Sequence, residues 1–144
     1  MDNNTETVIY CDGLCEPKNP GGIATYGWVI HYRGKLARTG NGFVCKGDGA
    51  TNNVAEYSGL IAALQYLVDK NYHAPITVLS DSQLMIRQLN GEYRVNSPRL
   101  LPLYQKAKEL VSGFEDVRFE WIPREQNTEA DRQSWKAYNE HRHL

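Results

Sequence analysis

Four acidic residues occupy positions where a solvated surface charge is not expected. Asp12 and Asp81 each follow a short apolar run that is typical of a strand, and ligands collect beyond the carboxyl ends of parallel strands in open sheets. Glu56 heads a helical stripe whose next members follow at spacings of 4, 3 and 4 residues, which turns it towards the apolar side of its helix. Asp131 falls in the first turn of the last predicted helix.

Each of these acids alone also has an ordinary explanation. Asp12 could belong to a turn, Asp81 could cap a helix, and Glu56 and Asp131 could be first-turn acids favoured by the helix dipole. If the four converge, like charges within about 4–6 Å raise one another's pKa values, and divalent cations relieve the repulsion. Hard carboxylates without His or Cys suit Mg²⁺ or Mn²⁺. Two such ions about 4 Å apart can activate a water and stabilise the leaving oxygen in phosphodiester hydrolysis.

The elements that must position these acids follow an α/β pattern. Three strand-like segments come first, and the turn at Arg33 and Gly34 between the second and third predicts an antiparallel meander. The helix that follows has plausible caps in Thr51 and Asn52. It is long enough for a crossover, so the fourth strand should lie parallel to an earlier one.

The predicted elements have the order βββαβααβα. The second helix is stopped at Asn90-Gly91, the third is opened by Ser97 and Pro98, and the last is capped by Asn127 or Thr128. The predicted ranges are strands 6–11, 24–32 and 35–43, helix 54–68, strand 76–80, helix 82–89, a helix from 97–98 to about 111, strand 117–121, and a helix from 127–128 towards 141.

Length and composition are typical of one globular domain spanning residues 1–144. The chain is 41% hydrophobic and 23% charged, with a net charge of −1, so charge alone gives no footprint for nucleic acid. No run approaches 18 apolar residues, and the polar start lacks a secretory signal, so we expect no membrane span and a cytoplasmic location. The cysteines, Cys11, Cys15 and Cys45, lack zinc spacing; we favour reduced thiols, and one bridge stays open.

Five motifs resemble, in their order and spacing, those of type 1 ribonuclease H. They are YCDG (10–13), NPGG (19–22), TNNVAE (51–56), LSDSQ (79–83) and EAD (129–131). The resemblance covers about residues 8–138 and implies a ribonuclease H-like fold, with a five-stranded mixed sheet flanked by helices. It also implies a sequence-independent endonuclease that hydrolyses the RNA strand of RNA–DNA hybrids by two-metal-ion catalysis, leaving 5′-phosphate and 3′-hydroxyl ends.

The resemblance assigns a role to each matched residue. It makes Asp12, Glu56, Asp81 and Asp131 the catalytic ligands of two Mg²⁺ or Mn²⁺ ions that are held when substrate is bound. It places the substrate contacts at Asn19, Asn52, Asn53 and Gln83 in the minor groove, Thr51 on a phosphate of the DNA strand, and Tyr93 near a deoxyribose.

Ordinary roles compete with these substrate contacts. The asparagines could be turn and cap residues, Thr51 could be only an N-cap, and Tyr93 could be a core residue. Cys15 matches a substrate-facing loop position of the family, but it could equally be a thiol in the loop without a role in binding.

Two departures from the family pattern bear on the mechanism. The segment 121–128 lacks the loop histidine that many relatives carry. Arg124 is the nearest candidate there: it could steady a phosphate or be a solvated loop charge, but it cannot shuttle a proton near neutral pH. Segment 90–98 lacks a lysine-rich helix, which indicates the compact form without a basic protrusion.

Other functions remain open at this point. Exonucleases with four acids place the first Asp and Glu two apart on one strand, whereas Asp12 and Glu56 are 44 apart here, which argues against that class. A nuclease that also cuts double-stranded RNA and a catalytically silent hybrid-binding module are the alternatives. The expected partner is an RNA–DNA hybrid, and the expected state is a monomer.

Overall fold

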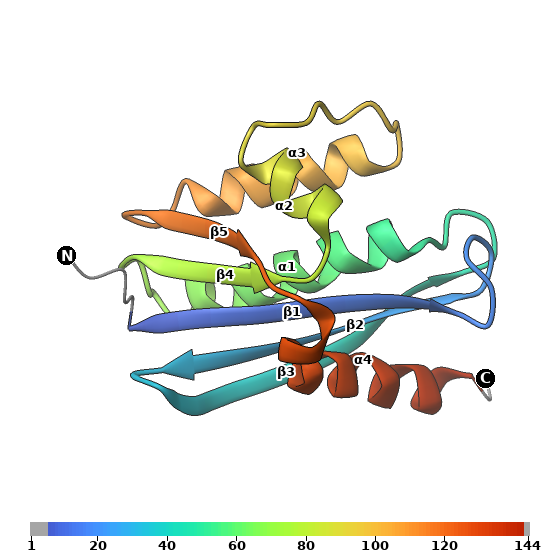
Figure 1. The fold of residues 1–144 in the computed structure, drawn as a ribbon, viewed down its shortest axis with the longest axis horizontal. Helices are drawn as coiled ribbons and strands as arrows, with labels where there is room; N and C mark the ends of the chain where they lie inside the picture. Colours follow the sequence, from blue (N-terminus) through green and yellow to red (C-terminus); the bar gives the residue numbers. More distant parts are fainter. Residues whose placement is uncertain (1–5, 143–144) are drawn as a thin grey trace.

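A five-stranded mixed sheet forms the centre of the structure, a computed structural model that describes residues 6–142 (Figure 1). The strands lie in the order β3-β2-β1-β4-β5, in which β3, β2 and β1 are antiparallel and β1, β4 and β5 are parallel. Their bounds are β1 Thr7–Glu16, β2 Ile23–Tyr32, β3 Lys35–Lys46, β4 Ile76–Ser80 and β5 Val117–Trp121. The order and the mixed sheet predicted from the sequence are confirmed.

Helices cover both faces of the sheet (Figure 1). Successive residues of a strand point to opposite faces, and in β2 the Trp28 ring packs on Tyr66 of α1 whereas the Thr25 hydroxyl donates to the carbonyl of Ser134 in α4. Helices α1 and α4 therefore lie on opposite faces. The bounds are α1 Asn52–Asp69, α2 Gln83–Leu89, α3 Leu100–Val111 and α4 Thr128–His141, with a 3-10 turn at Arg124–Gln126.

Strand β1 extends five residues beyond its predicted end, so Asp12 lies inside a strand and not after one. The parallel pairing with β4 ends at Cys11 and Ser80, but the antiparallel pairing with β2 continues to Glu16. Asp12 is thus the first residue beyond the parallel pairing. Strand β3 similarly continues three residues beyond its predicted end because it stays paired with β2.

The predicted caps locate two helix starts with different accuracy. The Thr51 hydroxyl accepts a hydrogen bond from the Val54 N–H at 3.1 Å, as a cap should, and α1 begins at once after it. Helix α3 begins at Leu100. The predicted start at Pro98 is therefore wrong by two residues. The Ser97 hydroxyl still accepts from the Leu100 N–H at 3.3 Å, so the predicted capping group is retained.

Two glycines let both helices approach the sheet beside Asp12. A Cβ on Gly13 would lie 2.4 Å from the backbone nitrogen of Glu56, and one on Gly27 would lie 2.3 Å from the carbonyl oxygen of Ala130. Gly27 is the antiparallel pairing partner of Asp12. Backbone contact on both faces therefore carries α1 and α4, and their acids, to the level of Asp12.

The three cysteines are free in the structure, and the reduced thiols favoured from the sequence stay a prediction. Cys11 and Cys15 are buried, and Cys45 is partly exposed. Over the part of the chain that the structure describes, no helix is long and apolar enough to cross a membrane.

Candidate active site

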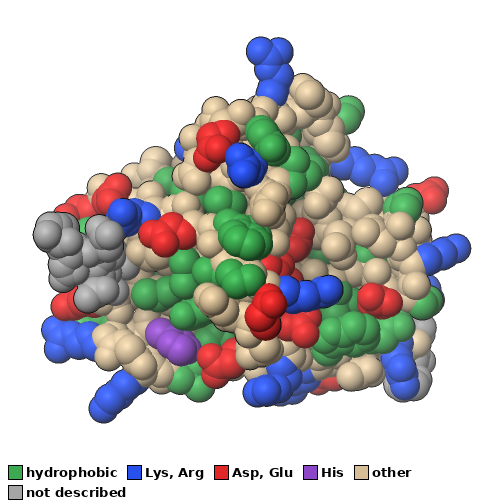
Figure 2. All heavy atoms as spheres, viewed as in Figure 1, with side chains coloured by type: hydrophobic (Ala, Val, Ile, Leu, Met, Phe, Trp, Pro, Cys, Tyr) green, Lys and Arg blue, Asp and Glu red, His purple; other side chains and the backbone are tan. Residues whose placement is uncertain are grey.

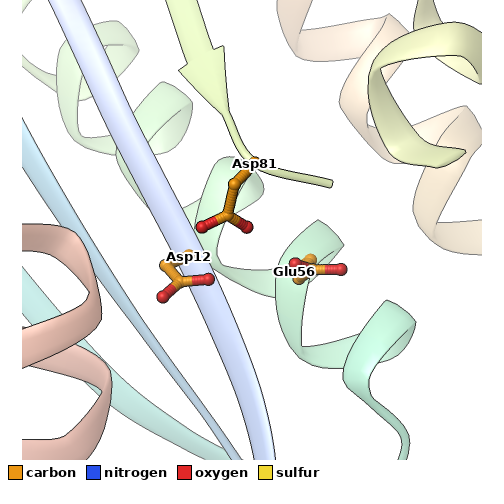
Figure 3. Close-up of side chains that lie close together, drawn as sticks. All are labelled: Asp12, Glu56 and Asp81. Atoms are coloured by element: carbon orange, nitrogen blue, oxygen red, sulfur yellow. The ribbon is translucent and has the colours of Figure 1, made fainter. Parts of the chain in front are cut away.

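Three of the four predicted acids converge in the structure. Asp12, Glu56 and Asp81 each offer a carboxylate oxygen, and these oxygens all lie within 4.8 Å of one another (Figure 3). Asp12 and Glu56 are each only 6% exposed, and Asp81 is partly exposed. Such a grouping of buried hard oxygens fits divalent cations of the Mg²⁺ and Mn²⁺ kind.

The neighbouring ends of β1 and β4 explain the convergence. Asp12 and Asp81 are the first residues beyond the parallel pairing of these strands, so adjacent chains deliver them side by side. Glu56 comes from α1, on the face that packs against β1. The Ser82 hydroxyl lowers the pKa of Glu56, so the segment after β4 acts on the acid that α1 carries.

Asp131 lies at the edge of this group. It stands in the first turn of α4 and lines the same cavity as the other three acids. Its charge and hydrogen-bonding capacity help raise the pKa of Asp12, so the acid on α4 acts directly on the acid of β1. The structure thus brings the four predicted acids into one place, with three clustered tightly and the fourth beside them.

Burial and mutual repulsion shift the acids away from their ordinary behaviour. Burial, followed by the Asp81 charge, raises the pKa of Glu56 to about 8. The same two causes raise the pKa of Asp12 well above its usual range. Burial also raises the pKa of Asp81, against the opposing effects of an Asn127 hydrogen bond and the Arg124 charge. A nearby cation would stabilise all three ionised forms.

These acids line a cavity of about 490 Å³, here termed the acidic cavity. Figure 2 shows acidic side chains gathered near the centre of the face that it presents. Among its described lining residues, Arg124 is the only base, and its charge lowers the pKa values of Glu56 and Asp81. Asn19 and Asn52 form part of the wall, and the Asn52 N–H donates to the Asn19 side-chain oxygen at 3.1 Å.

Four of the predicted substrate residues lie outside the lining of the acidic cavity. Thr51 caps α1, Asn53 follows in its first turn, and Gln83 opens α2 beside a separate cavity. Tyr93 is 48% exposed in the loop between α2 and α3, with the Arg87 guanidinium over its ring. The alternative of a buried core tyrosine is therefore wrong.

Asn127 has a role that the sequence reasoning missed. It was a candidate helix cap, but its side chain caps nothing and is 1% exposed. Its Nδ2 donates to the Cys11 carbonyl at 2.9 Å and to Asp81 Oδ2 at 3.4 Å, while its own carbonyl accepts from the Asp131 N–H at 3.1 Å. Both side-chain partners are distant in the sequence, so no local signal could have revealed them.

Two tryptophans in the wall were also missed. The Trp121 indole N–H donates to the Asp81 carbonyl at 3.2 Å, and so helps hold the segment that follows β4. Trp135 lies one turn after Asp131 on α4 and is 38% exposed. Its spacing of four residues from Asp131 is the only sequence signal for this placement.

Comparison with known proteins agrees with the geometry. Residues 11–137 match the family model described as "Reverse transcriptase-like". The N-terminal RNase H domain of Rv2228c from Mycobacterium tuberculosis has the same fold, with a TM-score of 0.84 and 38% identity over 94% of this chain and 95% of that one. The chain belongs to the type 1 ribonuclease H family. It spans only about a third (34%) of the full bifunctional protein Rv2228c, to which it is 41% identical over 128 residues.

Two further members of the type 1 ribonuclease H family are similar. Ribonuclease HI of Halobacterium salinarum is 37% identical over 134 residues, which cover 90% of this chain and 63% of that protein. LC11-RNase H1, isolated from compost, has a TM-score of 0.84 and 32% identity over 93% of this chain and 97% of that one. Its crystal structure was determined in complex with an RNA/DNA hybrid.

Proposed function

We propose that this protein is an endonuclease that hydrolyses the RNA strand of RNA–DNA hybrids, independently of base sequence. The observation that carries the proposal is the convergence of Asp12, Glu56 and Asp81 within 4.8 Å on a type 1 ribonuclease H fold. The hybrid-bound structure of LC11-RNase H1, a relative with the same fold, supports hybrid as the substrate.

The four acids are proposed to hold two Mg²⁺ or Mn²⁺ ions when substrate is bound. Asp12 and Asp81 present their carboxylates from adjacent chain segments, Glu56 from α1, and Asp131 from α4 at the rim. The ions would supply activation of a water and stabilisation of the leaving oxygen, and the products would carry 5′-phosphate and 3′-hydroxyl ends. The protein's own contribution is to hold the carboxylates close together, from four separate segments of the chain.

Arg124 is proposed to steady a phosphate in the acidic cavity. Its charge already acts on Glu56 and Asp81, so it faces the acids and is not a remote loop charge. A guanidinium stays protonated at neutral pH, so it orients and neutralises without transferring a proton. Arg124 therefore does not replace the proton-transfer capacity of the missing loop histidine.

The polar residues beside the cavity are proposed to contact the hybrid. The Asn19 side-chain oxygen is already bonded to the Asn52 N–H, which leaves the Asn19 Nδ2 group to donate to a 2′-hydroxyl or base edge. Asn52, Asn53 and Gln83 would reach the minor groove in the same way. Thr51 can accept from Val54 and still donate its hydroxyl proton to a phosphate of the DNA strand. The exposed Tyr93 ring would pack on a deoxyribose.

A cleavage assay tests the proposed function. Labelled hybrid, RNA duplex and DNA duplex are each incubated with the protein in Mg²⁺, Mn²⁺ or EDTA, and the product ends are identified. We expect cleavage of the hybrid alone, in its RNA strand and only with metal. Cutting of RNA duplex would indicate the broader nuclease, and binding without cutting would indicate the silent module.

A matched pair of variants links the activity to the site. Asp12→Asn should remove nearly all cleavage, since the amide is nearly isosteric but lacks the charge that holds cations. Asp116→Asn, an exposed residue at the far end of the sheet, should cleave normally. Wild-type turnover by Asp12→Asn would refute the proposal.

Single-domain organisation, a monomeric state and a cytoplasmic location stay predictions. Limited proteolysis, gel filtration and cell fractionation respectively test them.

A further inference from the structure

One face of α4 connects the acidic cavity to a second cavity. This face carries four residues at spacings of 4, 3 and 4: Asp131, Trp135, Tyr138 and, directly after the helix, Arg142. Asp131 and Trp135 line the acidic cavity, whereas Tyr138 and Arg142 line a cavity of about 550 Å³. The Trp135 and Tyr138 rings meet edge to face at 5.4 Å, so the two cavities share a continuous aromatic border.

The second cavity, here termed the basic cavity, has the opposite charge. Lys18, Lys46 and Arg142 line it, together with Tyr138 and the loop between β1 and β2. No Asp or Glu is among its lining residues within the described part of the chain, and Glu16 lines the acidic cavity instead. The protein has a net charge of only −1, so three cations around one hollow are a local concentration of positive charge.

The backbone holds these cations in place. Lys46 ends β3 and is paired with Ile23, a residue that packs with Tyr138 on the α4 face of the sheet. The Lys18 carbonyl accepts from the Gly22 N–H at 2.8 Å, and the Gly22 carbonyl accepts from the Gly47 N–H at 3.0 Å. Neither lysine forms an ion pair with any residue between 6 and 142. Both lysines are exposed and line the basic cavity, so their charges are available to a ligand.

We propose that the basic cavity binds backbone phosphates of the cleaved strand, a few nucleotides to one side of the cut. This inference rests on the proposed function. The 11 residue steps from Asp131 to Arg142 correspond to about 16 Å along the helix axis, a length over which one strand presents several phosphates. The exposed Trp135 ring covers the stretch between, where it would contact sugars. The loop between β1 and β2 and the C-terminal end of α4 lie at the same end of the molecule (Figure 1).

The basic cavity would offset the repulsion between the acidic cavity and a nucleic acid. The acidic cavity alone repels a polyanion, and among its described lining only Arg124 opposes that repulsion. The loop between α2 and α3, from residue 90 to 99, contains no helix and offers only Arg94 and Arg99 as cations. Phosphate contacts at Lys18 and Lys46 would supply attraction next to the acids without adding a charge that competes with bound cations.

The salt dependence of hybrid cleavage tests the inference. The double variant Lys18→Gln with Lys46→Gln is compared with wild type and with the control double variant Lys35→Gln with Lys108→Gln. The control removes the same charge at exposed sites, at the other end of β3 and on α3. For each protein, kcat and KM are measured on one hybrid from about 50 to 200 mM salt, and melting curves confirm folding.

We expect the Lys18 and Lys46 double variant to raise KM and leave kcat unchanged. The slope of log kcat/KM against log salt should become shallower by about 1 to 2, because each phosphate contact contributes about 0.9. The control should keep the wild-type slope. A wild-type slope in the test variant, or an equal change in the control, would overturn the inference, whereas a wild-type protein that cuts no hybrid would overturn the proposed function instead.

Hybrids with shortened flanks locate the contact. With the cut site held fixed, shortening the flank on one side should abolish the KM difference between wild type and the Lys18 and Lys46 variant. Shortening the other flank should preserve that difference. A difference that survives both truncations would show that the lysines act through general charge and not through a bound strand.

Discussion

Glu56 shows how its surroundings change the chemistry of a single carboxyl group. It lies in the second turn of a helix, where the sequence alone would permit a solvated acid, but it is buried beside Asp81. Its pKa is consequently raised to about 8 by burial and by that neighbouring charge. At neutral pH without metal, most of its population is protonated, and a bound cation would drive the proton off.

The raised pKa predicts how stability depends on pH in EDTA. The unfolded chain loses the Glu56 proton near pH 4, while the folded protein keeps it to about pH 8. Since the folded state binds more protons between these values, unfolding free energy should fall as pH rises, by at most about 1.4 kcal/mol per pH unit for this proton. Urea unfolding from pH 5 to 8.5 should show a smaller fall for Glu56→Gln than for the wild type.

The exposed Glu115→Gln serves as the control for this pH series. It should retain the wild-type dependence, because its carboxyl lies in water in both states. Equal slopes for Glu56→Gln and wild type would show that Glu56 is ionised in the folded protein well below pH 8.

Asn127→Ala should weaken metal binding. The variant removes the donor to Asp81 Oδ2 and to the Cys11 carbonyl, so the Asp81 carboxylate loses a partner that sets its direction. Loss of such an outer partner typically costs about 10- to 100-fold in metal affinity. Calorimetric titration with Mn²⁺ in the absence of substrate measures this directly.

Asn90→Ala is a matched control for Asn127→Ala. The Asn90 amide also donates to a backbone carbonyl, that of Phe119, at 3.1 Å, but it lies outside the acidic cavity. It should lower stability and keep the wild-type Mn²⁺ affinity. If both variants bind Mn²⁺ equally well, Asn127 supports only the fold.

At the scale of elements, close packing determines where the acids stand. Helix α4 approaches β2 so closely that Gly27 has no room for a side chain against Ala130. On the other face, α1 approaches β1 in the same manner at Gly13. The distances among the four carboxylates therefore depend on two helix–sheet contacts as well as on the residues themselves.

Gly27→Ala should separate α4 from the sheet. The added methyl group would lie 2.3 Å from the Ala130 carbonyl oxygen, so the helix must move and carry Asp131 away from Asp12. We expect a loss of about 1–3 kcal/mol in unfolding free energy and a drop in kcat. Urea unfolding and cleavage kinetics measure the two effects. Gly113→Ala, where the nearest atom is 3.3 Å away, should do much less; comparable losses would exclude the steric cause.

At the scale of the whole molecule, charge concentrates in patches on a nearly neutral protein. The net charge is −1, yet the acidic cavity is lined by five acids and one base, and the basic cavity by three bases. Ligands of opposite sign can therefore occupy adjacent parts of one surface. Bound cations would also relieve the repulsion that the fold imposes on its own carboxylates.

Saturating Mg²⁺ or Mn²⁺ should stabilise the folded protein. A ligand at one hundred times its dissociation constant adds about 2.7 kcal/mol when it binds only the folded state. Melting curves in EDTA and in metal, at equal ionic strength, should show this gain for wild type and much less of it for Asp81→Asn. In EDTA the variant should melt higher than wild type, because one repelling charge is gone. Identical curves in both conditions would contradict a clustered metal site.

Local patterns in the amino-acid sequence predict the order of the elements, most of their bounds and the four acids. These features depend on nearby residues: strand and helix periodicity in the chain, the Thr51 cap after a loop, and positive φ at Arg33 and Gly34 in the turn. The family motifs add the expectation that the four acids converge, because the fold of that family pairs β1 with β4. Such local and motif-level information needs no knowledge of what lies across the sheet.

Features that depend on partners far away in the chain emerge only from tertiary contacts. Pairing with β2 extends β1 past Asp12, and burial between β1, β4 and α4 turns Asn127 from a cap into a link to Asp81. The basic cavity likewise joins Lys18, Lys46 and Arg142, which the chain separates widely. The physical reason is that contacts across the sheet depend on register and helix packing, which set distances that no local pattern encodes.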